Sequence, residues 1–169
     1  TSNPEEMSER PDNEIWNYQQ VCLGYNYRMT DIAASLGLSQ IKRLTEIVRK
    51  RNEIADKYNQ ELAALPLQTP WQHPDTMSSY HLYVIRLDLE KIKKTQPQIH
   101  DELIDLGILV NLHYIPVYRQ PFYEQMGFKA GYCPESESYH RDALSIPMYP
   151  TLTIEEQDRV IATLKKVII

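Results

Sequence analysis

The sequence predicts an α+β fold in which helices cover a small, mainly antiparallel sheet. Apolar residues recur every three or four positions through several long stretches, which is typical of amphipathic helices. Short runs rich in β-branched and aromatic residues stand between these stretches and indicate strands. The two kinds of segment follow one another in mixed order without any internal repeat, so a single α+β layer is expected.

The first expected element is a long helix from Thr30 to Leu65. Its apolar residues keep helical spacing, Thr30 is a suitable N-cap, and Asp31 adds a negative charge to the first turn. Pro66 ends the run, which is long enough to contain a kink or a break into two helices. Small side chains surround Gly37. Because glycine in a helix costs about 1 kcal/mol relative to alanine, another element is expected to cross closely there.

The middle of the chain contains two expected strands with a helix between them. The first strand is expected at residues 80–87, with alternate side chains on opposite faces. Thr95 and Gln98 have the spacing of a capping box, which predicts a helix that ends before Gly107, a fitting C′ residue. The second strand is expected at residues 108–112.

The remaining segments are short, apart from the last helix. Thr153 opens a second capping box, with Glu156 three residues later, and predicts a helix that continues to the C-terminus. Four short segments follow from proline positions and local composition: a loop at 66–79, helices at 120–127 and 134–144, and a strand at 145–147.

Composition excludes several classes of protein. With 169 residues, of which 42% are hydrophobic, the chain can bury one sizeable core, so a second domain is not expected. The net charge is −5 and acidic and basic residues are interspersed, which leaves no basic stripe for nucleic acid. No apolar run is long enough to span a membrane, and no signal-peptide pattern opens the chain, so a cytoplasmic protein without membrane contact is expected.

The cysteines and histidines show no metal-binding pattern. Cys22 and Cys133 have no C-x-x-C motif and no histidine nearby, which suits a reducing compartment, although a disulfide between them stays open as an alternative. No two His or Cys residues stand at ligand spacing, so no bound metal is expected. His81 lies inside the first expected strand and is expected to be a packing residue.

Four segments carry a resemblance to a known family. Residues 24–40 resemble a signature of the DegT-like sugar-nucleotide aminotransferases, which are pyridoxal-phosphate enzymes of fold type I. Residues 79–85, 107–117 and 144–151 resemble later blocks of the same family, in the same order. Between Leu109 and Phe128 the sequence is most similar to transaminases that make UDP-4-amino-4,6-dideoxy sugars of the pseudaminate or bacillosamine type.

The resemblance implies that the chain is the C-terminal small domain of such an enzyme. Residues 24–169 would form this domain, and residues 1–23 would be an arm that leads to a large cofactor-binding domain outside the chain. Family members are more than twice as long, so a fragment is expected. Their cofactor-holding lysine lies in the large domain, and the nine lysines here lie on charged helical or turn surfaces. No catalytic residue is therefore assigned, and the chain alone is expected to be inactive and to bind pyridoxal phosphate weakly or not at all.

Two residues of the first segment are assigned binding roles. By the resemblance, Asn26 matches an asparagine that reaches across a dimer to the cofactor phosphate of the other subunit. An amide donor suits this role because it binds an anion without adding charge. Arg28 is assigned to substrate, because a guanidinium can hold a carboxylate or a diphosphate through two parallel bonds. The alternative for Arg28 is a salt bridge that braces the loop.

Further substrate contacts are expected after the second strand. His113 follows the strand end, a position where polar residues commonly bind ligands. The resemblance implies that this segment faces the nucleotide sugar. Tyr114, Tyr118 and Arg119 are the other candidates.

The resemblance also implies a reaction. The intact enzyme would be a homodimer with shared active sites that transfers an amino group from glutamate to a UDP-linked 4-keto-6-deoxy sugar, in the biosynthesis of amino sugars and surface glycans. Two alternatives stay open. In the first, the chain is part of a sugar dehydratase of the same fold, which carries histidine in place of the upstream lysine. In the second, the chain is a non-catalytic α+β module that dimerises through its first long helix. An upstream Ser-x-x-x-x-Lys stretch in the full-length reading frame would indicate the transaminase.

Overall fold

The computed structural model describes residues 5, 19, 24–25 and 27–169. These residues belong to two compact units, residues 1–41 and residues 42–169. Asn26 and nearly all of the predicted arm at residues 1–23 lie outside the described residues, so both assignments stay predictions.

The first unit contains one described α-helix, α1 (Asp31–Ile41), which begins as predicted. The backbone N–H of Ala33 donates to Oγ1 of Thr30 at 3.3 Å, and Asp31 lies in the first turn. None of the residues of α1 is buried. A Cβ placed on Gly37 would have nothing within 4 Å, so the described residues of this unit do not make the predicted close crossing, which stays a prediction for the rest of the protein.

The predicted long helix is broken in two. After α1 the chain makes a turn at residues 42–43, and α2 (Leu44–Glu61) follows in the second unit. Only the C-terminal half of α2 contributes buried side chains, namely Ile54, Ala55 and Tyr58. The helical spacing of the apolar residues therefore holds on both sides of the turn, while only the second helix is anchored in the core that the structure describes.

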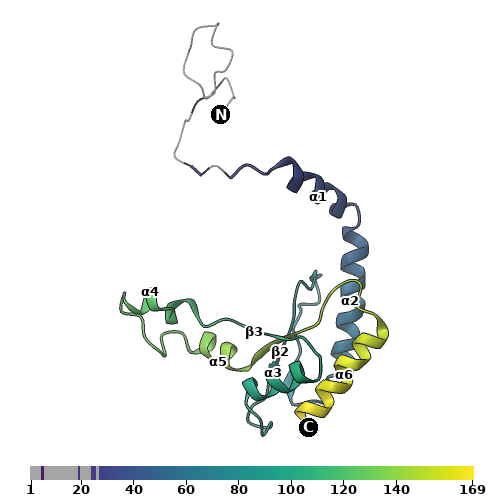
Figure 1. Cartoon of the computed structure of the whole chain (residues 1–169), viewed down its shortest axis with the longest axis vertical. Helices are drawn as coiled ribbons and strands as arrows, with labels where there is room; N and C mark the ends of the chain where they lie inside the picture. Colours follow the sequence, from purple (N-terminus) through teal and green to yellow (C-terminus); the bar gives the residue numbers. More distant parts are fainter. Residues whose placement is uncertain (1–4, 6–18, 20–23, 26) are drawn as a thin grey trace. The chain divides into compact units, whose positions relative to one another are not determined.

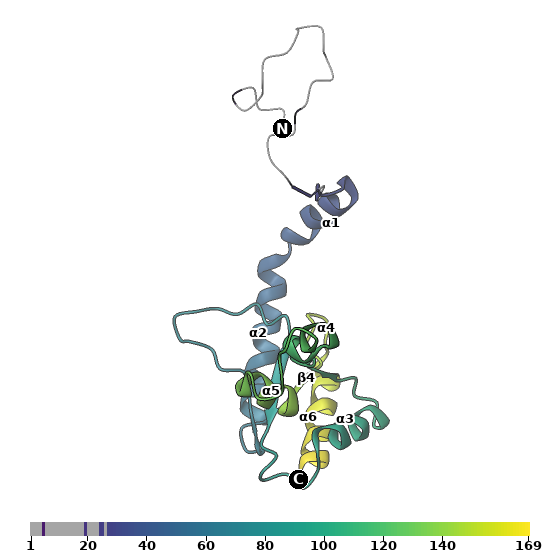
Figure 2. The same ribbon diagram turned by 90° about the vertical axis from the view of Figure 1, so that its left-hand side faces the viewer.

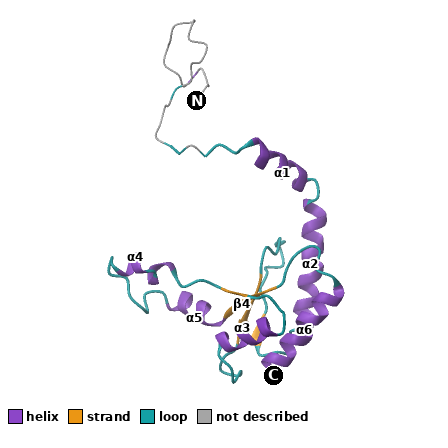
Figure 3. Ribbon diagram, viewed as in Figure 1, coloured by secondary structure: helices purple, strands orange, loops and turns teal. Residues whose placement is uncertain are grey.

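The second unit is built on a four-stranded sheet with the strand order β1-β2-β4-β3, and all neighbouring strands are antiparallel. Figure 3 shows the strands of this sheet in orange. The predicted mainly antiparallel sheet is thus confirmed. The strands, with their bounds, are β1 (Leu67–Gln68), β2 (Tyr83–Leu87), β3 (Asn111–Leu112) and β4 (Ala143–Ile146).

The strand boundaries differ from the predicted ones. β1 lies in the segment expected to be a loop, β3 is shorter than the predicted strand at 108–112, and β4 begins two residues before the predicted 145–147. The strand predicted at 80–87 begins only at Tyr83, because Tyr80 has a positive φ of 42° and interrupts the extended backbone. His81 therefore precedes the strand and is exposed, so its predicted packing role is wrong.

Three helices cover one face of the sheet: α2, α3 (Gln96–Asp105) and α6 (Ile154–Ile168), with α6 beside α2 (Figures 1 and 2). The predicted capping boxes are present at the N-termini of α3 and α6. The predicted alternation holds in β2, where Tyr83, Ile85 and Leu87 share one face and are buried beneath these helices. The buried amide of Gln157 donates to the carbonyl oxygen of Ile54 at 2.8 Å and so ties α6 to α2.

Gly107 ends α3 in the predicted way. Its φ is +79°, and its N–H donates to the carbonyl oxygen of Ile104 at 2.9 Å. The N–H of Ile108 donates to the carbonyl oxygen of Leu103, also at 2.9 Å. These two bonds make a Schellman motif, which satisfies carbonyl groups that the helix end leaves free.

Residues 113–142 form an excursion between β3 and β4 that contains no buried residue. The excursion carries η2 (Val117–Arg119), α4 (Pro121–Glu124) and α5 (Pro134–Asp142). The helix predicted at 120–127 is thus shorter, and the one predicted at 134–144 stops at Asp142 because β4 uses the next residues. In Figure 1 α4 and α5 lie on the side of the sheet away from α2 and α6.

Candidate functional site

The face of the sheet turned away from α2, α3 and α6 carries polar side chains. In β2 this face holds Val84 and Arg86, which pair with Ser145 and Ala143 of β4. β3 pairs Asn111 with Ser145, so His113, two residues further on, is brought to the same face. The register of the three strands therefore gathers an arginine, a histidine and a serine on one surface.

His113 is fixed from two sides. Its Nε2 lies 2.5 Å from Oγ of Ser145, a residue that is only 5% exposed. Its backbone carbonyl accepts a hydrogen bond of 2.7 Å from Nδ1 of His140 in α5. Burial lowers the pKa of His113 below its ordinary value of 6.5, so the ring is uncharged at neutral pH. The result is a rigidly held, neutral imidazole at the strand end.

A groove of about 510 Å³ lies beside His113, between the chain that follows β3 and helix α5. The residues that line it are His113, Tyr114, Ile115, Pro116, Val117, Glu135, Ser136 and Tyr139. Tyr114 is 88% exposed, so its phenol is free to contact a ligand. Two of the predicted substrate residues thus line one groove, together with aromatic and apolar side chains of the kind that form ligand sites.

Tyr118 and Arg119 have their polar groups engaged within the excursion. The hydroxyl of Tyr118 donates to Oε1 of Glu137 at 2.6 Å, and the same carboxylate oxygen accepts from the N–H of Gly131 at 2.8 Å. Nε of Arg119 donates to Glu124 at 2.9 Å. The hydrogen bond from Tyr118 lowers the pKa of Glu137. These contacts shape the excursion, and a ligand role for either residue would come in addition to them.

Arg28 belongs to the first unit, where its side chain is exposed. The rings of Tyr25 and Tyr27 beside it are stacked at a centroid distance of 5.1 Å. Among the described residues no salt bridge involves Arg28, so the alternative of a bracing ion pair gains no support. Asn26, between the two tyrosines, lies outside the described residues.

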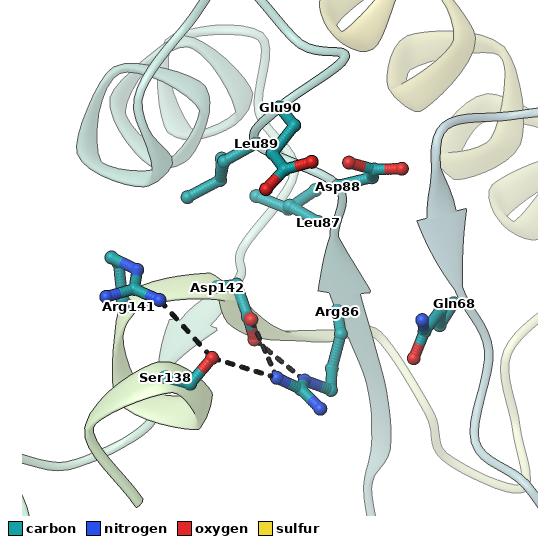
Figure 4. Close-up of a pocket in the computed structure, with 9 residues that line it drawn as sticks. All are labelled: Gln68, Arg86, Leu87, Asp88, Leu89, Glu90, Ser138, Arg141 and Asp142. Atoms are coloured by element: carbon teal, nitrogen blue, oxygen red, sulfur yellow. Dashed lines mark hydrogen bonds and ion pairs between the residues drawn. The ribbon is translucent and has the colours of Figure 1, made fainter. Parts of the chain in front are cut away.

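A second hollow, of about 510 Å³, lies over the end of β2, and none of the predicted site residues lines it (Figure 4). Its centre is the ion pair of Arg86 and Asp142, which has two hydrogen bonds of 2.8 Å. Ser138 lies between Arg86 and Arg141 and accepts from both guanidinium groups. Because these charged groups already satisfy one another, this hollow is a structural junction between β2 and α5.

Sequence reasoning did not single out Ser145, His140, Tyr139 or Arg86, which surround His113. Arg86 lies 5.7 Å from the ring centroid of Tyr139, and that ring lies 5.9 Å from the ring of His113. The only local signal was the alternation of the predicted strand, which places Arg86 on the face opposite Tyr83 and Ile85. The others depend on the pairing of β3 with β4 and on the position of α5.

None of the nine lysines, all of which lie in the described part of the chain, has the buried, apolar setting that favours covalent attachment of a carbonyl cofactor. An amine that attacks a carbonyl must lose its proton, and burial in an apolar setting favours that loss. Every lysine here is exposed or half-buried. Five of them pair with carboxylates, namely Lys50, Lys57, Lys91, Lys94 and Lys165.

The described part of the chain contains neither a candidate metal site nor a helix that could span a membrane. No three His, Cys, Asp or Glu side chains of the described residues come together in a way that could hold a metal ion. Among the helices of residues 27–169, none is both long and apolar enough to cross a membrane.

Comparison with known proteins identifies the family. Residues 6–165 match the model of the DegT/DnrJ/EryC1/StrS aminotransferase family. The chain belongs to this family. The resemblance carried by the four sequence segments is thereby confirmed. One relative is the spore coat polysaccharide biosynthesis protein SpsC of Bacillus subtilis. It is 35% identical to this chain over a region that covers 92% of this chain and 41% of SpsC.

Solved structures of family members share the fold. Spr1654, a putative sugar aminotransferase of Streptococcus pneumoniae, is 33% identical in sequence to this chain. The similarity covers 90% of this chain and 38% of the Spr1654 chain, with a TM-score of 0.80. PseC of Helicobacter pylori, an aminotransferase involved in the biosynthesis of pseudoaminic acid, is 26% identical over 98% of this chain and 43% of its own, with a TM-score of 0.81. The predicted α+β aminotransferase fold is confirmed, and the chain spans about 40% of the length of these relatives.

Proposed function

We propose that this chain is the C-terminal domain of a pyridoxal-phosphate-dependent sugar aminotransferase. Residues 24–169 form the domain and residues 1–23 the arm that leads to a large cofactor-binding domain. The observation that carries the proposal is the family match over residues 6–165, supported by the groove beside His113. Spr1654 has been described in forms with pyridoxal phosphate and pyridoxamine phosphate, which supports the same cofactor in the intact enzyme.

In this proposal the cofactor supplies the electron sink for amino-group transfer, and the chain supplies binding groups. Because no lysine of this chain fits covalent attachment, the holding lysine belongs to the large domain. Asn26 donates to the cofactor phosphate of the partner subunit in a homodimer with shared active sites. Arg28 holds the carboxylate of glutamate or the diphosphate of the nucleotide sugar, and His113 and Tyr114 contact the sugar, with Tyr118 and Arg119 beside them.

The substrates we propose are glutamate and a UDP-linked 4-keto-6-deoxy sugar, and the enzyme acts in the cytoplasm. The similarity to PseC supports this choice of sugar. The apolar side chains of α1, namely Ile32, Leu36, Leu38 and Ile41, are each at least 63% exposed. A large domain or a partner subunit would cover such a helix in the intact enzyme.

The first experiment tests the reaction with the protein expressed from its full-length reading frame. Purified enzyme is incubated with the UDP-linked keto sugar and nitrogen-15 glutamate, and the product is analysed by mass spectrometry. We expect a labelled amino sugar. A product that has lost its hydroxyl group without gaining nitrogen would instead indicate the dehydratase, and no conversion of any keto sugar would overturn the proposal.

The second experiment tests the role of Asn26. A hydrogen bond to a charged group is worth roughly 1.5–3 kcal/mol, so Asn26→Ala should weaken cofactor affinity by about one to two orders of magnitude. Arg28→Ala should leave cofactor affinity unchanged and raise KM for glutamate or the nucleotide sugar. Arg28→Lys should restore little, because lysine cannot form two parallel bonds.

Mixed dimers test whether Asn26 acts across the interface. A subunit without the upstream lysine is mixed with a subunit that carries Asn26→Ala. If the site is shared, one hybrid site has both defects and the other has neither, so activity should partly return. No recovery, despite demonstrated subunit exchange, would show that Asn26 serves its own subunit.

The chain alone offers a third test. We expect it to show no transaminase activity and no cofactor that borohydride fixes to a lysine. Fixation of pyridoxal phosphate on one specific lysine of the purified chain would contradict the assignment of the holding lysine to the large domain.

A further inference from the structure

Ser145 has a buried hydroxyl group on β4, an inner strand of the sheet, and the only hydrogen bond of this hydroxyl among the described residues joins it to His113. The serine is 5% exposed, and its Oγ lies 2.5 Å from Nε2 of His113. Ser145 is one of three buried polar residues in the described part of the chain, the others being Gln96 and Gln157. Both glutamines donate to backbone carbonyl oxygens, which gives them a structural role. Ser145 instead points its polar atom at a side chain that lines the groove.

The protons of this pair can be assigned by counting donors and acceptors. A serine hydroxyl carries one proton, and a buried donor needs an acceptor. If Nε2 of His113 carried the ring proton and donated to Ser145, the hydroxyl proton would have no acceptor in the part of the chain that the structure describes. If Nε2 accepts, the hydroxyl proton is satisfied and the single ring proton lies on Nδ1. The second arrangement leaves no buried donor without a partner.

A second histidine, His140, forms a hydrogen bond with the backbone of His113. Its Nδ1 lies 2.7 Å from the carbonyl oxygen of His113. A carbonyl oxygen only accepts, so Nδ1 of His140 carries a proton. The two contacts fix His113 at its backbone from α5 and at its ring from β4. Nδ1 of His113 has no hydrogen-bond partner among the described residues, and it remains available to a ligand.

We propose that Ser145 is a positioning residue, which donates to Nε2 of His113, holds the ring in the Nδ1–H tautomer, and so presents an uncharged N–H donor to an oxygen atom of the sugar in the groove. The choice of ligand rests on the proposed function. An uncharged donor suits a hydroxyl or keto oxygen, because it adds no charge that would compete for the diphosphate. The lowered pKa of His113, which burial causes, agrees with an uncharged ring.

The tautomer can be measured on the chain itself without cofactor or substrate. Nitrogen-15 NMR of histidine-labelled chain distinguishes a ring nitrogen that carries a proton from one that does not. We expect the Nδ1–H pattern for His113, as for His140. An Nε2–H pattern for His113 at neutral pH would overturn the proposal.

Variants test whether Ser145 causes the tautomer. Ser145→Ala removes the donor, and His113 should then change to the Nε2–H form that imidazoles of histidine favour in water. Ser145→Thr keeps a hydroxyl and should keep the Nδ1–H form. Ser138→Ala serves as the matched control, because this hydroxyl has hydrogen bonds only to Arg86 of β2 and Arg141 of α5 within the described part of the chain. An unchanged tautomer in folded Ser145→Ala would contradict the causal role.

The ligand is tested separately in the intact enzyme. Ser145→Ala should raise KM for the nucleotide sugar about five- to tenfold, the loss expected for one hydrogen bond, and should leave KM for glutamate unchanged. Equal changes in both constants would contradict the assigned contact. If the intact enzyme aminates no sugar while His113 shows the Nδ1–H tautomer, the proposed function fails and the positioning by Ser145 stands.

Discussion

The guanidinium of Arg86 and the carboxylate of Asp142 are joined by two parallel hydrogen bonds, each 2.8 Å long (Figure 4). The pair connects β2 to the last residue of α5, a helix that has no buried residue of its own. Asp142 raises the pKa of Arg86 through this contact. Because α5 lines the groove beside His113, the pair also fixes one wall of the candidate site.

Arg86→Lys should lower the free energy of unfolding by about 1–2 kcal/mol, because lysine cannot make the two parallel bonds to Asp142. Urea unfolding followed by circular dichroism measures the change. Arg141→Lys is the control, since Arg141 makes one exposed hydrogen bond to Ser138 at 3.3 Å and should change stability by less than about 0.5 kcal/mol. Equal losses in the two variants would show that the paired geometry contributes nothing.

Gly107→Ala should destabilise the protein more than Gly131→Ala. Both glycines have positive φ, +79° and +83°, so backbone strain in each alanine variant should lower the free energy of unfolding by about 1 kcal/mol or more. At Gly107 the new Cβ would also lie 2.7 Å from Nη2 of Arg159, which donates to the carbonyl oxygen of Leu106. Displacing that bond should add up to about 1 kcal/mol.

A double-mutant cycle tests this explanation by thermal unfolding. If Arg159 causes the excess, Gly107→Ala should cost less in an Arg159→Ala background than in the native chain. A cost that is the same in both backgrounds would assign the whole effect to backbone strain.

The protein should lose stability above about pH 10. Burial raises the pKa of Tyr58 and of Tyr83, both of which have fully buried side chains. The unfolded chain releases these protons near the ordinary value of about 10, whereas the folded chain keeps them. Each tyrosine thus contributes stability that is complete below about pH 10 and is lost as the pH rises, by about 1.4 kcal/mol per pH unit.

Unfolding in urea at several pH values between about 9 and 11 measures this slope. Tyr83→Phe should be less stable at neutral pH, because it loses the 2.5 Å bond to Asn59, but its stability should fall less steeply with pH. Tyr114→Phe, at an 88% exposed position, should keep the full slope. A slope unchanged in Tyr83→Phe would contradict the assigned origin.

Glu137→Ala should loosen the excursion without unfolding the core. Its carboxylate accepts from Tyr118 and from the N–H of Gly131, so that amide should exchange with solvent faster in the variant. Glu135→Ala, two residues earlier on the same helix, is the control. The pKa of Glu137 is lowered, so protection of the Gly131 amide should persist as pH falls through the ordinary glutamate range and be lost only below it. Equal exchange in both variants would contradict the role of Glu137.

Features that depend on a few neighbouring residues were predictable from the sequence. The capping boxes of Thr95 and Thr153 and the C′ glycine of α3 were correct, because their hydrogen bonds close within one turn of helix. The alternation of buried and half-buried residues in β2 was also correct. The predicted length of this strand was wrong, because the identity of residue 80 as tyrosine gives no indication of its positive φ.

Features that depend on strand pairing could not be predicted. β1 is a strand only because Leu67 and Gln68 pair with Leu87 and Arg86 across a long loop. His113 was found from its position after a strand, but its partner Ser145 lies 32 residues away and is set by the register of β3 and β4. Arg86 and Asp142 are 56 residues apart, so their ion pair depends on the same tertiary arrangement.

The excursion at residues 113–142 also bears on how such a domain can evolve. It starts and ends on two hydrogen-bonded neighbours, β3 and β4, and contributes no buried side chain to the core. Doubling the length of such a connection costs only about 0.6 kcal/mol in loop-closure entropy. Insertions and deletions can therefore accumulate between Pro116 and Pro134 while Ser145 and His113 stay in place. The pair of strands β3 and β4 can in this way carry grooves of many shapes.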